Sequence, residues 1–120
     1  MPRETRDPAA LIPLKHSTFR VLLALADGEL LHGYAIMQAV AEMSNGRETI
    51  LPGTLYAALA RMVDEGLVEE REGADPSGGP PRRYYRRTSF GRAVARVEYE
   101  RLRALLDIAR AQRILPGARK

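Results

Sequence analysis

The chain has 120 residues, of which 45% are hydrophobic and 28% charged, values that are ordinary for a single globular domain with a modest core. It contains no cysteine, which excludes disulfide bonds, thiolate metal sites and a cysteine nucleophile. No apolar run is long enough to span a bilayer, and the N-terminal stretch lacks the apolar segment of a signal peptide. We therefore expect a cytoplasmic protein with no membrane partner.

The distribution of charge points to a polyanion. The net charge is only +4, but residues 71–92 hold six arginines and two acids, whereas residues 31–70 hold two cations and six acids. A GC-rich genome is an alternative reason for the abundance of arginine, yet it does not explain this clustering. Because the planar guanidinium group matches phosphate groups and base edges, the clustering favours nucleic acid as the partner.

Two helices are predicted in the first part of the chain. Residues 1–13 are rich in proline and mixed charges, so we expect a flexible N-terminal tail. The first helix covers residues 14–26, with Ser17 or Thr18 as its cap or with Pro13 as an alternative earlier start. The second begins at His32, which we interpret as a capping residue because no second metal ligand lies near it in the sequence, and it runs to about residue 44.

The next segment, residues 51–72, combines a helix with a strand. A β-branched run at 49–51 is expected to add a third small strand. The helix covers residues 52–65, and Gly66 stops it. Its apolar seam repeats at helical spacing and comprises Leu55, Leu59, Met62 and Val63. The opposite face carries small residues and one long cation, namely Thr54, Ala57 and Arg61.

A hairpin follows this helix. Its strands are predicted at 67–72 and 82–88, joined by the Gly/Pro-rich tip GADPSGGPP. Arginines bracket Tyr84 and Tyr85 on the return strand, a pattern that is typical of a nucleic-acid contact. The alternative is a solvated hairpin whose tyrosines pack on the core, and strand alternation sends at least one of them there.

The last helix, capped by Thr88 or Ser89 and running to about residue 113, is too long for a domain of this size to cover. Apolar residues repeat along it at the 4-3-4-3 spacing of a coiled coil. We expect this seam to bind a second copy of the chain, through Ala95, Tyr99, Leu102, Leu105, Leu106 and Ala109. The alternative is that the helix folds back on its own domain.

These elements predict a mainly α fold with a small β-hairpin wing, which is a winged helix-turn-helix followed by a long C-terminal dimerisation helix. The domain boundaries that we expect are a tail at 1–13, a DNA-binding domain at 14–88, a dimerisation helix at 89–115 and a disordered tail at 116–120.

Three stretches carry a resemblance to a known family: LLALADGELLHGYAI, PGTLYAALARMVDEGLVEE and RRYYRRTSFGR. On these motifs the chain resembles the PadR family of bacterial transcriptional regulators. The resemblance implies a homodimeric repressor that binds double-stranded DNA at a palindromic operator. It also implies a small aromatic or hydrophobic effector near the dimer interface in those members that have one. Three positions depart from the family pattern: Leu51 replaces a capping residue, Arg87 a leucine, and Ser89 an acid. The chain also has no tryptophan.

The resemblance and the residue pattern together give a set of expected DNA contacts. They lie in the second helix, in the helix at 52–65, which the resemblance identifies as the recognition helix, and in the wing at 67–88. These residues are Tyr34, Pro52, Gly53, Thr54, Tyr56, Ala57, Arg61, Arg82, Arg83 and Arg86. The sequence motifs leave two rivals. A winged-helix module that binds protein is favoured by the acidic stretch 64–70. An enzyme is excluded by the lack of a nucleophile, phosphate loop or metal spacing beside His16 and His32, so we expect no catalytic residue, metal or cofactor.

Overall fold

The computed structural model describes residues 6–26 and 28–114 of the chain. The expectations for residues 1–5 and for the C-terminal tail at 116–120 lie outside the described residues. The elements are η2 (Pro8–Leu11), α1 (His16–Ala24), β1 (Leu31–His32), α2 (Gly33–Met43), α3 (Pro52–Asp64), β2 (Val68–Gly73), β3 (Arg82–Arg87) and α4 (Ser89–Ala111).

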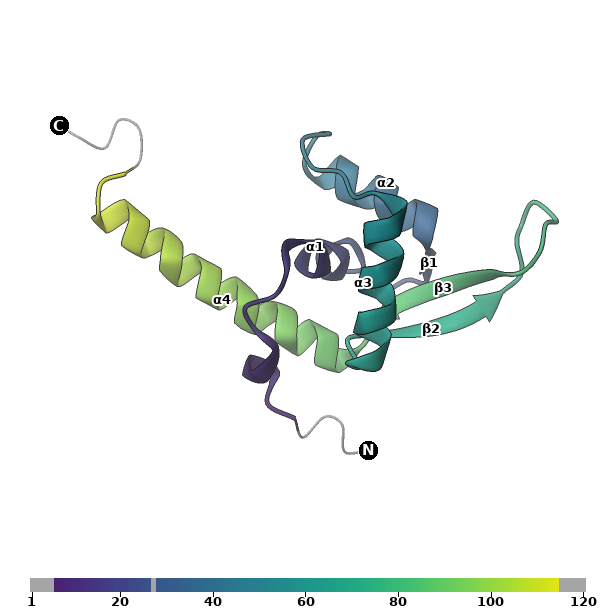
Figure 1. Cartoon of the computed structure of the whole chain (residues 1–120), viewed down its shortest axis with the longest axis horizontal. Helices are drawn as coiled ribbons and strands as arrows, with labels where there is room; N and C mark the ends of the chain where they lie inside the picture. Colours follow the sequence, from purple (N-terminus) through teal and green to yellow (C-terminus); the bar gives the residue numbers. More distant parts are fainter. Residues whose placement is uncertain (1–5, 27, 115–120) are drawn as a thin grey trace.

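The three helices α1 to α3 form the body of the molecule, as Figure 1 shows. The β2–β3 hairpin extends from one side of this body and α4 from the other, so the longest dimension reaches 61 Å. The strands form one antiparallel sheet in the order β1-β3-β2. The prediction of a mainly α fold with a small wing, a winged helix-turn-helix, is therefore confirmed.

The core lies where α1, α2, α3, the base of the hairpin and the first turns of α4 meet. Leu55, Leu59 and Met62 are at most 1% exposed, so the predicted seam of α3 is the face that packs inward. Val63, the fourth predicted member, is only partly buried at the edge of the core. The amphipathic pattern thus orients α3 with its small residues outward.

Two local predictions in the first half of the chain are wrong. The third strand is Leu31–His32, which pairs with β3, whereas residues 49–51 form no strand. Their apolar residue, Ile50, is instead buried as an anchor in front of α3. The cap of α1 is Lys15, without a side-chain hydrogen bond, and Ser17 and Thr18 lie inside the helix. By contrast His32 caps α2, because its Nδ1 accepts a hydrogen bond from the backbone N–H of Ala35 at 3.3 Å.

The N-terminal segment is packed on the body where it is described. Residues 8–11 form a short 3-10 helix, and Leu11, Ile12 and Leu14 lie partly buried against the core. The guanidinium of Arg6 lies over the ring of Phe90 at 4.2 Å and donates to the backbone oxygen of Glu65 at 2.5 Å. The expectation of a flexible tail is therefore wrong for this part of residues 1–13.

The helix α4 has two parts with different surroundings. Its first turns are buried in the domain, including Phe90, Gly91, Val94, Ala95 and Glu98. The remainder projects from the body (Figure 1), so the alternative in which the whole helix folds back on its own domain is wrong. Ala95, only 8% exposed, belongs to the core of its own chain and is removed from the expected dimer seam.

Close backbone contact fixes the start of α4. Thr88 caps the helix, since its Oγ1 accepts from the N–H of Gly91 at 2.9 Å and donates to the carbonyl of Gly66 at 2.6 Å. A Cβ built on Gly91 would lie 2.1 Å from the carbonyl oxygen of Leu67, which follows α3 directly. Only glycine permits this approach, which ties the end of α3 to the beginning of α4.

Glu98 is a charged residue inside this packing, with 2% exposure. Arg101 donates to it twice, at 2.7 and 2.8 Å, and the backbone N–H of Leu14 donates at 3.3 Å. The Arg101 guanidinium holds the pKa of this carboxyl below its usual range, against the opposing effect of burial. The hydrogen bond from Leu14 anchors the N-terminal segment on α4, and Arg101 keeps its acceptor charged.

Replacing Gly91 with alanine should destabilise the fold by about 3 kcal/mol, because the new methyl group meets a backbone atom that cannot rotate away. Urea denaturation of the two proteins measures the change. Gly53→Ala is the matched control, because no atom lies within 4 Å of its added Cβ and alanine favours the helix by about 0.5 kcal/mol. Equal stability of wild type and Gly91→Ala would show that α4 is not packed this closely.

Glu98→Gln should lower stability at pH 7 by about 2 kcal/mol, through loss of the charged hydrogen bonds to Arg101. Because the folded pKa of Glu98 is lowered, its contribution is complete above the unfolded pKa of about 4.3 and is lost as the pH falls through the folded value. Denaturation curves at pH 7 and pH 3 should therefore show a large difference between the two proteins at pH 7 and a small one at pH 3. A constant difference would contradict the assignment.

Candidate nucleic-acid interface

The outer face of α3 is small and uncharged over its first two turns. Gly53, Ala57 and Ala60 lie opposite the buried seam and are exposed, with Pro52 and Thr54 beside them. Side chains of this size let the helix backbone approach another surface closely. Leu51 stands at the N-cap without a side-chain hydrogen bond, so the first backbone N–H groups of α3 have no side-chain partner from it.

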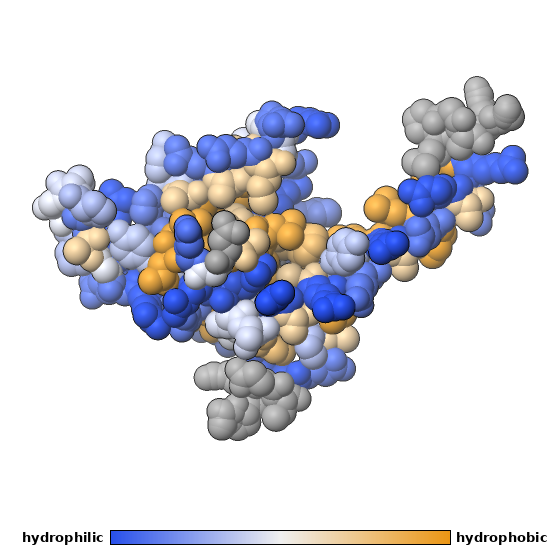
Figure 2. All heavy atoms as spheres, turned by 180° about the vertical axis from the view of Figure 1, so that it is seen from behind, coloured by the Kyte–Doolittle hydropathy of each residue, from blue (hydrophilic) through white to orange (hydrophobic). Residues whose placement is uncertain are grey.

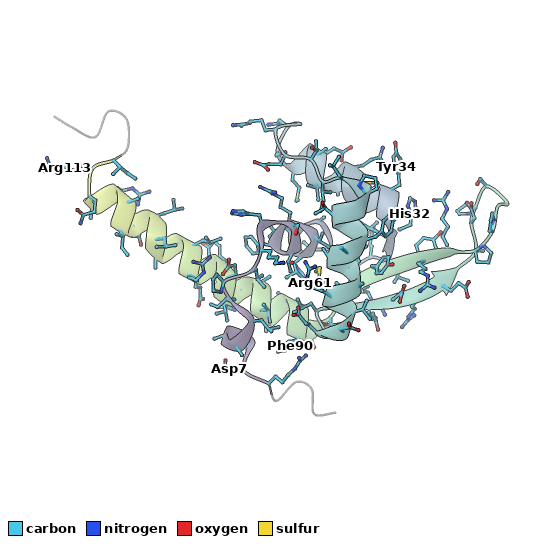
Figure 3. All side chains as sticks on the ribbon, in the orientation of Figure 1. Asp7, His32, Tyr34, Arg61, Phe90 and Arg113 are labelled. Carbon is cyan, nitrogen blue, oxygen red and sulfur yellow. The ribbon has the colours of Figure 1, made fainter. Side chains whose placement is uncertain are left out.

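The two larger polar residues of α3 lie on opposite flanks. Tyr56 faces the hairpin, whereas Arg61 projects on the side of α3 away from it (Figure 3). Arg61 is half-buried, and its Nη1 donates a long 3.5 Å bond to the backbone oxygen of Ala57. The single cation of this helix therefore stands beside the exposed face and leaves the centre to small side chains.

A cleft of about 480 Å³ lies between α2, α3 and β3. Its lining is aromatic and cationic and comprises His32, Gly33, Tyr34, Tyr56, Arg82, Arg83 and Tyr85. Tyr34 is 61% exposed and therefore does not face the core. Tyr56 lies so close over Gly33 that an added Cβ there would meet its hydroxyl at 2.1 Å.

Alternation along β3 divides the wing residues between two faces. Tyr85 is 5% exposed and packs on the core, as predicted for at least one of the two tyrosines. Tyr84, on the other face, donates from its hydroxyl to the backbone oxygen of Ala74 at 3.0 Å and meets the His32 ring edge-on. Arg83 shares the face of Tyr85, whereas Arg82 and Arg86 share that of Tyr84.

Each of these three arginines already has an acidic partner. Arg82 pairs with Asp75 at 3.3 Å and Arg83 with Glu70 at 2.6 Å. Arg86 donates to Glu69, which lies directly opposite it in the register. Composition separates the acidic stretch from the basic one and so does not predict these pairs. The strand register, with Glu69 opposite Arg86, brings the two stretches together.

Arg87 has a structural position away from the wing tip. Its Nη2 donates to the backbone oxygen of Ala26 at 2.9 Å and its Nη1 to that of Leu22 at 3.3 Å. The guanidinium thus satisfies carbonyls at the end of α1, where a cation also suits the helix dipole. The departure from the family pattern at this position replaces apolar packing with a helix cap.

The projecting part of α4 exposes an apolar stripe. One face of this helix is buried in its first turns, at Gly91, Ala95 and Glu98. The same face continues, at the same spacing of about 3.5 residues, through Leu102, Leu105 and Ala109. Tyr99, Leu105, Leu106 and Ile108 are 49–61% exposed. Hydrophobic atoms accordingly appear along this arm in Figure 2. The face that is covered in the first turns of α4 is left uncovered in the last ones.

Other kinds of site find no support in the described residues. In residues 6–26 and 28–114, no group of three or more His, Asp or Glu side chains is arranged to hold a metal ion. Within the same ranges, no helix has the length and apolarity needed to cross a membrane. His32, one of the two imidazoles, serves as the cap of α2.

Solved structures of transcriptional regulators share this fold. A regulator from Clostridium thermocellum superposes with a TM-score of 0.72 and 22% identity, covering 83% of this chain and 91% of that one. Bacillus subtilis PadR in complex with operator DNA gives a TM-score of 0.60 and 21% identity, covering 75% of this chain and 48% of that one.

Sequence comparison adds two matches. An uncharacterized protein from a Streptomyces fradiae transposon is 52% identical over 52 residues, which are 43% of this chain; the match spans only 14% of that longer protein. The model of the transcriptional regulator PadR-like family matches residues 21–97, from α1 through the wing to the buried part of α4. The chain therefore belongs to the PadR-like family of transcriptional regulators.

Proposed function

We propose that the protein is a homodimeric repressor that binds a palindromic DNA operator through α3 and the wing. The observation that carries this proposal is the exposed, small-residue face of α3 beside a hairpin rich in arginine. An α-helix with small outer side chains fits the major groove, which is about 12 Å wide. The operator complex of the structurally similar Bacillus subtilis PadR supports the same use of this fold.

The contacts divide by chemistry. Thr54 and Ala57 offer methyl groups for thymine, and Arg61 is positioned on the flank for a guanine. Pro52 and Gly53 bring the start of α3 towards a phosphate group, whose charge suits a helix N-terminus. Tyr34 and Tyr56 border the cleft along which the DNA backbone would pass between α3 and the wing.

The wing supplies electrostatic attachment. Arg82, Arg83 and Arg86 are proposed to bind phosphates or the minor groove, which fixes the position of the protein without reading sequence. Because all three have acidic partners in the free chain, their net contribution is smaller than three unpaired cations would give.

The dimer is proposed to form through the projecting part of α4. Its uncovered stripe, which comprises Tyr99, Leu102, Leu105, Leu106 and Ala109, matches the pattern of a helix–helix seam. A two-fold dimer would place two α3 helices in successive major grooves, about 34 Å apart. A small aromatic or hydrophobic effector is proposed to bind in the same interface, between α1 and α4, as the family resemblance implies.

The second candidate is a winged-helix module that binds a protein. It is favoured by three acids near the proposed DNA-binding face. Asp64 and Glu70 line the cleft between α3 and the wing, and Glu69 lines a neighbouring cleft. Titration of random duplex DNA at 50 and 200 mM salt separates the two. Phosphate binding predicts a steep loss of affinity with salt, whereas a protein-binding module gives no salt-sensitive DNA binding.

Arg83→Ala and Arg61→Ala should have different effects on DNA binding. Loss of Arg83 removes a phosphate contact, so affinity for operator and random DNA should fall alike. The slope of log K against log salt should flatten by less than about 0.9, because Glu70 neutralises part of the Arg83 charge in the free chain. Loss of Arg61 should cost about 1 to 3 kcal/mol on the operator and little on random DNA, relaxing sequence preference. Fluorescence anisotropy at several salt concentrations measures both. Unchanged operator affinity in both variants would contradict this contact map.

Leu106→Glu should give monomers, because it places a charge in the centre of the exposed stripe of α4. Analytical ultracentrifugation at micromolar concentration measures the mass, and operator affinity should fall by at least about 100-fold as the second half-site contact is lost. Ala104→Glu is the matched control, since it adds the same charge to an exposed position of the same helix outside the stripe. A Leu106→Glu protein that remains dimeric would rule out this interface.

A further inference from the structure

The wing arginine nearest to α3 is held by a carboxylate from the same hairpin. Arg83 Nη1 donates to Glu70 Oε2 at 2.6 Å, and the hydroxyl of Tyr85 donates to the same oxygen at 3.3 Å. Arg83 is 70% exposed at its side chain, whereas Glu70 is only 28% exposed. The acid is thus fixed in the wall of the wing while the cation reaches outward from it.

Glu70 occupies a position where it meets any anion that approaches Arg83. Together with Tyr56, Ala60, Asp64 and Arg83 it lines a cleft of about 410 Å³ between α3 and the wing. A phosphate that binds Arg83 from this cleft must either displace the carboxylate or share the guanidinium with it. Like charges at such separations repel, and the repulsion is stronger where solvent is partly excluded.

The other two wing pairs do not have this relation to α3. Alternation places Glu69 and Arg86 on the opposite face of the hairpin, and Asp75 pairs with Arg82 beyond the end of β2. Glu72 shares the face of Glu70, two residues further towards the tip. In the described residues it acts on Arg83 through space only, without a hydrogen bond to it. Glu70 is therefore the acid with a direct hold on the cation beside the recognition helix.

We propose that Glu70 is an internal counter-ion for Arg83 that competes with DNA phosphate and so sets the strength of the sequence-independent part of binding. This inference rests on the proposed DNA-binding function. Because Arg83 is paired with Glu70, it contributes less to nonspecific DNA binding, so the affinity of the protein for DNA depends more on the contacts of α3. The raised pKa of Tyr85, caused first by burial and then by Glu70, is consistent with a fixed negative charge at this point.

The test compares Glu70→Gln with Glu72→Gln in the 120-residue chain. Glutamine keeps the size of the side chain and an acceptor for the Tyr85 hydroxyl, and thermal denaturation checks that both variants fold. Binding to a random 20-base-pair duplex is measured by anisotropy from 50 to 200 mM salt. Glu70→Gln should bind about fivefold more tightly at the lowest salt, because a partly exposed ion pair no longer has to be broken before Arg83 binds phosphate. Its log–log salt slope should steepen by less than about one unit, because wild-type Arg83 already makes part of its phosphate contact, and Glu72→Gln should show a smaller change in both.

A double-mutant cycle assigns the effect to Arg83. In an Arg83→Ala background, Glu70→Gln should change affinity no more than Glu72→Gln does. The inference is overturned if Glu70→Gln weakens binding, since Glu70 would then position Arg83 for phosphate. It is equally overturned if the two glutamine variants behave alike, or if the effect persists without Arg83. Absence of salt-sensitive DNA binding by the wild-type protein would instead overturn the proposed function itself.

Discussion

The packing of α4 against the end of α3 is the contact on which the rest of the structure depends. Gly91 lies so close to the carbonyl of Leu67 that no side chain fits between them, and Thr88 bonds to the residue that ends α3. Arg6 adds a third link, from the backbone of Glu65 to the ring of Phe90. The proposed recognition helix and the proposed dimerisation helix are thereby joined through backbone contacts with little freedom to move independently. An effector that shifted α4 would have to move α3 with it.

The fold could be predicted from the sequence wherever the hydrophobic periodicity agreed with the glycine and proline signals at the ends of elements. The seam of α3, the stop at Gly66 and the Gly/Pro-rich hairpin tip all encode local geometry, and each element is present. The third strand could not be predicted in the same way. Leu31 and His32 form a strand because β3 offers them a free edge, which is a tertiary fact, and residues 49–51 have the stronger β propensity but no partner. The packing of the N-terminal segment could not be predicted for a similar reason, because its contacts come from α4 and from the end of α3.

The candidate interface shows the same division. Helical spacing predicted which residues of α3 are exposed. The exposure of Tyr34 could be known only from the structure. The partners of the wing arginines depend on strand register, so composition alone overstated the free positive charge of the hairpin. Arg87 illustrates the point most clearly: in the sequence it belongs to the basic cluster, but in the structure its guanidinium binds the end of α1.

The central claim is that α4 holds two copies of α3 at a fixed separation, so that a paired site is recognised. Selection of bound sequences from a pool of random duplexes, using the 120-residue chain, tests this claim most directly. The proposed dimer predicts enrichment of inverted repeats whose half-sites lie about 10 base pairs apart from centre to centre. Enrichment of single half-sites, of repeats with no preferred spacing, or of no sequence at all would contradict it.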